Sequence, residues 1–170
     1  MTTTPHPSTI DIQRLPETKE WRLVANQWLP LTPEQLFPFF SDAHNLQQIT
    51  PQTLSFEILT PAPITMGEGT LIDYKIKIHG VPAKWRTRIS TWEPPHRFVD
   101  EQLKGPYRKW HHLHEFMAID DGTLCRDTVH YQVPGGPLSP LIHSLIVKRD
   151  VQNIFQYRMR TLDKLFNKCD

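Results

Sequence analysis

The last part of the chain carries an apolar repeat that few folds can accommodate. Beyond the break Pro134-Gly135-Gly136-Pro137, apolar side chains recur every three or four residues up to Phe166. They are Leu138, Leu141, Ile142, Leu145, Val151, Ile154, Phe155, Leu162, Leu165 and Phe166. This spacing predicts one amphipathic helix on the order of 40 Å long at 1.5 Å rise per residue. Such a helix needs an equally extended apolar surface to pack against.

The preceding sequence offers that surface as a series of strands. Alternating apolar residues predict strands over 21–29, 53–59, 70–79, 83–92, 97–103, 109–119 and 124–133. Turn sequences such as Asp120-Asp121-Gly122 separate the last six of these runs, which favours antiparallel hairpins joined in order. Two short helices are expected at 33–40, which Pro38 interrupts, and at 43–49.

These elements predict an α+β fold, a curved antiparallel sheet of about seven strands with two short helices and a long C-terminal helix. Residues 1–18 are polar and proline-bearing, and we expect them to be a flexible tail or an edge extension. Residues 19–170 are then expected to be a single domain.

Composition excludes several classes of function. Lys and Arg, at 19, nearly balance Asp and Glu, at 18, so nothing indicates binding to nucleic acid. No apolar run is long enough to span a bilayer, so no stable membrane insertion is expected. Cys125 and Cys169 form neither a disulfide framework nor a metal motif, which favours a cytoplasmic location. No phosphate-binding glycine loop indicates a nucleotide, and no cofactor is predicted.

Polar residues interrupt the apolar pattern on the faces expected to point inward. Period-two alternation places three sets of side chains there. They are Phe98, Asp100 and Gln102; Trp110, His112, His114 and Phe116; and Cys125, Asp127, Val129 and Tyr131. Because an ionisable group is costly to bury without a partner, several in one core indicate a pairing network or a ligand site.

Three interpretations of His112 and His114 are open. In the first, the histidines pair with Asp100 and Asp127 and only fix the strand register. In the second, they line a cavity and orient the polar end of an apolar ligand. In the third, one histidine and one aspartate act as a general base, or the pair holds a metal. Two histidines without a third ligand at a known spacing are a weak metal signal, so no metal is predicted.

Arg158 lies on the apolar stripe of the predicted helix, four residues from both Ile154 and Leu162. Its stem could pack while its head reaches water. Alternatively, its guanidinium could point at the inner carboxylates or at an anionic group of a ligand. The sequence leaves both interpretations open.

Several local sequences, spread over about Trp21 to Phe166, carry a resemblance to a known superfamily. They are Phe40-Ser41-Asp42, Asn45-Leu46, Thr50-Pro51, Gly80-Val81-Pro82, Trp85, Arg97-Phe98-Val99-Asp100-Glu101-Gln102, Gly105-Pro106-Tyr107, Trp110-His111-His112, His114, Phe116, Asp127, Tyr131, Pro134, Ile154-Phe155 and Tyr157-Arg158. With the element order, they resemble the START-like helix-grip proteins of the SRPBCC superfamily, which include polyketide cyclase/dehydrase-related and coenzyme-Q-binding members. The resemblance is to a bacterial branch without an assigned activity.

The resemblance implies a cavity between sheet and C-terminal helix that binds a small hydrophobic or amphipathic molecule, such as a lipid, quinone, polyketide or aromatic metabolite. The residues expected to contact it are Tyr74, Ile76, Trp85, Phe98, Asp100, Gln102, Trp110, His112, His114, Tyr131 and Arg158. No catalytic motif of a polyketide aromatase can be placed residue by residue, so the fold leaves activity open.

Two further functions are therefore weighed beside simple binding. A cyclase/dehydrase-type enzyme would use His112 or His114 as base and Asp100 or Asp127 as the orienting carboxylate. An interaction module would instead use the outer sheet face, where Lys84, Arg86 and Arg88 form a basic row. The sequence indicates neither the ligand nor the oligomeric state.

Overall fold

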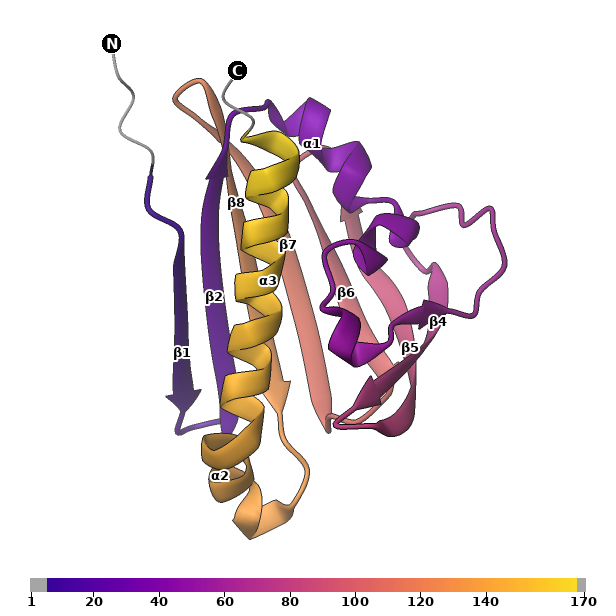
Figure 1. Cartoon of the computed structure of the whole chain (residues 1–170), viewed down its shortest axis with the longest axis vertical. Helices are drawn as coiled ribbons and strands as arrows, with labels where there is room; N and C mark the ends of the chain where they lie inside the picture. The colour runs from indigo at the N-terminus through magenta and orange to yellow at the C-terminus, as the bar shows by residue number, and fades with distance from the viewer. Residues whose placement is uncertain (1–5, 168–170) are drawn as a thin grey trace.

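The computed structural model describes residues 6–167, and within them eight strands form one antiparallel sheet that a long helix crosses (Figure 1). The strand order is β1-β2-β8-β7-β6-β5-β4-β3. The strands are β1 (Thr9–Leu15), β2 (Glu20–Leu29), β3 (Glu57–Ile58), β4 (Leu71–Ile78), β5 (Val81–Glu93), β6 (Arg97–Lys104), β7 (Lys109–Ile119) and β8 (Gly122–Gln132). The α+β helix-grip architecture predicted from the sequence is confirmed, with eight strands in place of about seven.

The additional strand is β1, which lies inside the segment expected to be a tail. Its residues pair antiparallel with β2, from Thr9 opposite Asn26 to Leu15 opposite Glu20. Ile10 and Ile12 pack against buried residues of the core. Of the two alternatives for residues 1–18, the edge extension is the one that the structure has over Thr9–Leu15, because two isoleucines spaced by two give this stretch a half-buried face. Residues 1–5 lie outside the described part of the chain.

The strand predicted over 53–59 is also wrong for most of its length. Only Glu57–Ile58 pairs with β4, and Gln52–Leu54 forms a 3₁₀ turn (η2) instead. Ser55 follows that turn in a left-handed conformation, with φ of 43°, which breaks any extended run. The two short helices are confirmed as α1 (Pro33–Phe40) and a 3₁₀ helix, η1 (Ala43–Gln47), which the Asp42 carboxylate caps at the His44 N–H.

The C-terminal helix is nearly continuous, but it changes winding near its start. A 3₁₀ turn, η3 (Gly136–Leu138), leads into α2 (Ser139–Ile142), a π-helical segment η4 (His143–Val147) and α3 (Lys148–Phe166). Leu138, Leu141 and Leu145 are 63%, 57% and 68% exposed, so their predicted place on the packed stripe is wrong. The π segment shifts the buried stripe, and His143 takes the inward position.

His143 shows how the start of the helix is attached to the sheet. Its ring stacks on Trp21 at 3.4 Å between centroids, and Nε2 and the Tyr131 hydroxyl form a hydrogen bond of 2.8 Å. Burial lowers the pKa of His143 to about 4, so the ring is uncharged at neutral pH. From there α3 lies along the sheet and buries Val151, Phe155, Arg158 and Leu162. No helix among residues 6–167 is long and apolar enough to cross a membrane.

Candidate functional site

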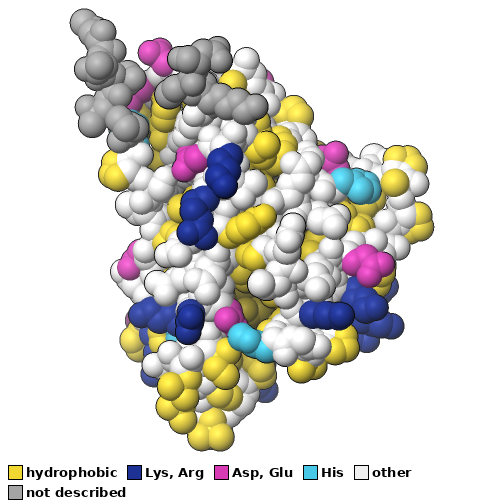
Figure 2. Space-filling view, in the orientation of Figure 1, with side chains coloured by type: hydrophobic (Ala, Val, Ile, Leu, Met, Phe, Trp, Pro, Cys, Tyr) yellow, Lys and Arg dark blue, Asp and Glu magenta, His cyan; other side chains and the backbone are white. Residues whose placement is uncertain are grey.

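A cavity of about 180 Å³ lies between α3, the inner face of the sheet and the segment from α1 to η2. The sheet contributes Ile72, Tyr74 and Ile76 of β4 together with residues of β5, β6 and β7. Figure 2 shows the corresponding hollow beside the helix, with hydrophobic side chains inside it. Asp150 of α3 also lines the cavity and pairs with His79 at 2.7 Å, joining the helix to the β4–β5 turn.

Most of the residues predicted to contact a ligand do line this cavity. They are Tyr74, Ile76, Trp85, Phe98, Asp100, Trp110, His112, His114 and Arg158. Their alternate spacing in the strands predicted the inner face correctly, because β4 buries Ile72, Tyr74 and Ile76 and β7 buries His112, His114 and Phe116.

Gln102 and Tyr131 do not line the cavity. The Gln102 amide instead donates to the Tyr107 carbonyl at 2.7 Å, which fixes the turn between β6 and β7. Tyr131 is fully buried in a second apolar cluster, where it binds His143. Both predictions assumed that every inward residue of a strand reaches the same cavity. The cavity lies over β4 to β7, and no residue of β2 or β8 lines it.

Several lining residues were not predicted from the sequence. Phe39, Phe40 and Leu46 close the cavity from α1 and η1, and Ile154 and Phe155 close it from α3. The helical residues were recognisable as apolar, but periodicity alone does not show which apolar residues face a void. Tyr107 was missed because it follows a glycine–proline break, where strand alternation no longer applies.

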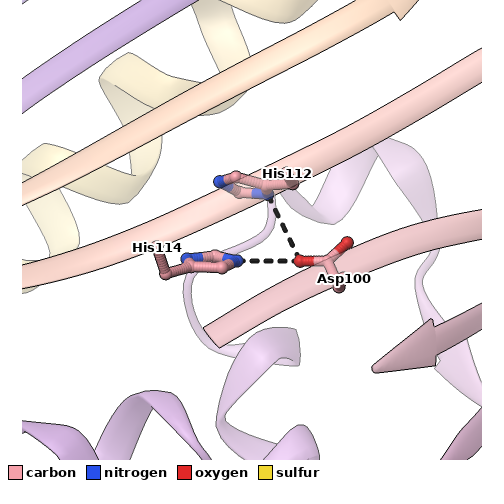
Figure 3. A group of neighbouring side chains, drawn as sticks. All are labelled: Asp100, His112 and His114. Atoms are coloured by element: carbon pink, nitrogen blue, oxygen red, sulfur yellow. Dashed lines mark hydrogen bonds and ion pairs between the residues drawn. The ribbon is translucent and has the colours of Figure 1, made fainter. Parts of the chain in front are cut away.

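Four polar side chains form a closed ring of contacts beside the cavity, and three of them, Asp100, His112 and His114, line it. Asp100 comes from β6, His112 and His114 from β7, and Asp127 from β8. Asp100 Oδ2 lies 2.8 Å from His114 Nε2 and 3.5 Å from His112 Nδ1 (Figure 3). Asp127 Oδ1 lies 2.9 Å from both His112 Nε2 and His114 Nδ1. Only the first Asp127 contact is aligned as a hydrogen bond.

The strand register explains this ring. Asp100 lies opposite His112, and Asp127 lies opposite His114. The two aligned hydrogen bonds, His114 to Asp100 and His112 to Asp127, therefore run diagonally between neighbouring strands. Both histidines also line the cavity, so the aspartate pairing of the first interpretation and the cavity position of the second occur in the same two residues.

The two imidazoles have different acid strengths. Burial and the nearby His114 lower the pKa of His112 to about 4, against the pull of both carboxylates. Burial also disfavours charge on His114, but its contacts with Asp100 and Asp127 outweigh this and raise its pKa. One proton is thus favoured on His114, while His112 is neutral.

The carboxylates remain ionised despite being buried. Burial raises the pKa of each, yet the histidines and Arg158 outweigh it, lowering the pKa of Asp100 and holding that of Asp127 well below its ordinary value. The two carboxylates therefore face Arg158 and His114, the imidazole whose pKa is raised, and this pairing explains how these groups are tolerated inside the fold.

Asp100, His112 and His114 also have the composition of a metal site, since one ligand atom from each lies within 4.8 Å of the others. Imidazole nitrogens and carboxylate oxygens bind zinc and ferrous iron. However, each imidazole nitrogen already faces a carboxylate oxygen, and the cationic Arg158 lies beside Asp127. These contacts favour a hydrogen-bonded network over a metal centre.

The outer face of the sheet carries the basic row formed by Lys75, Lys77, Lys84, Arg86 and Arg88. Two of its members are paired. Arg86 binds Asp73 at 2.8 Å, and Arg88 binds Glu101 at 2.9 Å. Such pairs lower the positive potential that a nucleic-acid contact would need.

The fold and the cavity together define the class of protein. An antiparallel sheet that grips a C-terminal helix over an apolar cavity is the START-like helix-grip architecture. Within that class, the chain belongs to the family described as polyketide cyclase / dehydrase and lipid transport, whose sequence model matches residues 29–160. No curated protein sequence matches the chain.

Solved structures with the same fold share little sequence with the chain. TTHA0849 from Thermus thermophilus is 17% identical with a TM-score of 0.67, covering 84% of this chain and 94% of its own. The Zhui aromatase/cyclase from Streptomyces sp. R1128 is 14% identical with a TM-score of 0.65, covering 84% and 91%. Ara h 8.0201 is 18% identical with a TM-score of 0.60, covering 85% and 99%. At these identities the likeness shows the fold alone.

Proposed function

We propose that the protein binds a small hydrophobic or amphipathic molecule in the cavity between the sheet and α3. The observation that carries this proposal is an apolar cavity with a polar cluster confined to one wall. Apolar walls supply affinity through burial, and a few fixed polar groups set orientation. The cytoplasm is the proposed location, since Cys125 is a buried free thiol.

The size of the cavity supports a compact ligand. Its volume of about 180 Å³ is below the roughly 300–1,000 Å³ of pockets for drug-sized ligands. It slightly exceeds the ~150 Å³ engineered cavity that binds benzene. A single ring with a short substituent therefore fits within it, whereas a lipid or a quinone tail would have to extend beyond it. Native mass spectrometry of protein purified from its own host tests the proposal, because a ligand retained in the cavity adds its mass.

Filling the cavity from β4 is expected to abolish binding. Ile76 is buried and lines the cavity, while its neighbour Lys77 points to the outer face and is exposed. Ile76→Trp should weaken binding of an environment-sensitive naphthalene dye at least tenfold, and Lys77→Trp should leave it unchanged. Fluorescence titration measures both. Equal affinities in the two variants would place the dye elsewhere and contradict the proposal.

A second candidate function is proton transfer in a cyclisation or dehydration, which the family description includes. The observation that favours it is a neutral imidazole, His112, which lines the cavity while Asp127 orients it at 2.9 Å. A base with a pKa of about 4 is weak, so its contribution is expected at the lower end of the range for general acid–base catalysis, about 10²-fold.

His112→Gln is therefore expected to slow conversion of a poly-β-keto thioester to its dehydrated ring about 10²-fold. The matched control is His111→Gln, which changes the neighbouring residue on the other, partly exposed face of β7. Product formation is followed by mass spectrometry as the loss of water. Undiminished turnover in His112→Gln, or equal loss in both variants, would exclude His112 as the base.

A further inference from the structure

Arg158 is buried without the hydrogen bonds that a guanidinium normally makes. Its side chain is 8% exposed, and Nε and Nη1 have no hydrogen-bond partner among the described residues. Its closest carboxylate oxygen in an ion pair is Asp127 Oδ1, 3.6 Å from Nη1, which is beyond hydrogen-bonding distance. The guanidinium carbon instead lies 4.9 Å from the centre of the Phe155 ring. The burial of these two nitrogens argues against the interpretation in which the Arg158 head reaches water.

The carboxylates of the cluster accept no hydrogen bond from Arg158, and the Asp127 oxygen that pairs with it also faces the histidines. Asp127 Oδ1 faces both His112 and His114, and Asp100 Oδ2 faces the same two rings. Asp127 therefore balances the charge of Arg158 at a distance but does not accept its N–H groups. A buried donor that lacks an acceptor costs free energy, and more so when it is charged.

Arg158 also lines the cavity, so the missing acceptor can come from a ligand. We propose that the natural ligand is a compact organic acid whose carboxylate accepts hydrogen bonds from Arg158 while its apolar body occupies the cavity. This inference rests on the proposed binding function and specifies the chemical class of the ligand. A planar carboxylate matches the fork of guanidinium donors better than a single carbonyl oxygen does, and charge assistance strengthens each bond.

The position of Arg158 suits such a ligand. Phe155 and Ile154 line the cavity from the same helix, so an apolar body can rest on α3 while its acidic end meets the arginine. On the sheet side, the apolar part of the ligand can contact Ile72, Ile76 and Ile89. The cavity volume of about 180 Å³ limits that body to one ring or a small fused pair.

Binding an acid should be linked to proton uptake. An incoming carboxylate adds one negative charge beside the cluster. His112 faces Asp100, His114 and Asp127, and its ring is uncharged at neutral pH. Added negative charge raises the pKa of His112. The pKa of His112 is about 4 in the ligand-free protein and should be higher in the complex. Between these two pKa values, affinity for the acid should fall as pH rises.

The test compares acids with neutral molecules of the same shape by calorimetry on the full chain. The matched probes are benzoate with benzamide and 2-naphthoate with 2-naphthamide. For wild type we expect each acid to bind at least tenfold more tightly than its amide. Arg158→Met should remove this preference while retaining amide binding, which also shows that the variant is folded. Arg160→Met, at an exposed position on the same helix, should retain the preference.

The outcomes separate this inference from the function on which it rests. If acids and amides bind wild type equally, or if Arg158→Met keeps the preference for acids, the inference is overturned and simple binding stands. If wild type binds neither these four probes nor the naphthalene dye, the proposed function itself fails. Heats measured in two buffers of different ionisation enthalpy should show proton uptake with the acids and none with the amides.

Discussion

Replacing Asp127 with asparagine is expected to lower the free energy of unfolding by about 3–5 kcal/mol, the usual cost of removing one partner from a buried ion pair. The Asp127 side chain is 16% exposed and contacts both histidines and Arg158. Its loss leaves Arg158 and both histidines with Asp100 as the only remaining carboxylate of the cluster. Urea denaturation followed by circular dichroism measures the change.

The matched control is Asp73→Asn on the outer face of the sheet. Asp73 also pairs with an arginine, Arg86, at 2.8 Å, but both side chains are 40% or more exposed. Exposed pairs contribute at most about 1 kcal/mol, so this variant should remain close to wild type. Similar losses in the two variants would show that burial does not set the strength of the Asp127 interactions.

The same cluster gives stability a defined pH dependence. The pKa of His112 falls from about 6.5 in the unfolded chain to about 4 in the fold, and that of His143 falls likewise. The unfolded chain therefore binds more protons between these values, and the two histidines make the fold less stable as pH falls from about 6.5 to about 4. The raised pKa of His114 acts in the opposite direction, since its contribution is lost as pH rises through the folded value.

Phe155→Ala is expected to cost about 3–5 kcal/mol of stability and to enlarge the cavity. Phe155 is 1% exposed and packs between β2, β8 and the cavity. Its ring meets the His112 ring edge-on, with 5.7 Å between the ring centroids. Truncation removes buried apolar area and leaves a void that a close-packed interior fills only in part. Thermal and urea unfolding measure the loss, and the exposed helix position Gln156→Ala is the control.

Phe155→Ala also provides a binding readout. Because Phe155 lines the cavity, the shortened side chain should admit larger ligands. Affinity for 2-naphthamide should then rise relative to benzamide, and a saturating amount of the larger probe should recover part of the lost stability. An unchanged preference between the two amides would mean that Phe155 does not limit the size of the site in which the probes bind.

Strand alternation predicted most of the fold because every second residue of a strand points to the same face of the sheet. Ile72, Tyr74 and Ile76 of β4 are buried as expected, and so are His112 and His114 of β7. The errors fall where this local rule gives way to tertiary context. Leu141 and Leu145 continue the apolar spacing of the helix, yet the π segment and the absence of sheet beneath them leave both exposed.

The polar residues of the candidate site were predicted from the sequence, but the extent of the cavity was predicted less well. Alternation placed Asp100, His112 and Asp127 on one face, but it gave no information on which oxygen meets which nitrogen. That choice depends on the register between strands and on side-chain rotamers, which arise only when the strands pair. The missing hydrogen bonds of Arg158 could not be predicted, since they depend on where the carboxylates lie relative to both the histidines and α3.

The strand order has a consequence for how the chain is assembled during synthesis. β2 is made early, but its second neighbour, β8, is made last among the strands, and Trp21 pairs with Tyr131 across most of the sequence. The β2 edge of the β1–β2 hairpin must therefore remain open while the ribosome adds β3 to β8. Such non-local pairing folds slowly and exposes strand edges to other chains. Truncated chains that end before Gly122 would keep that edge open and are expected to aggregate.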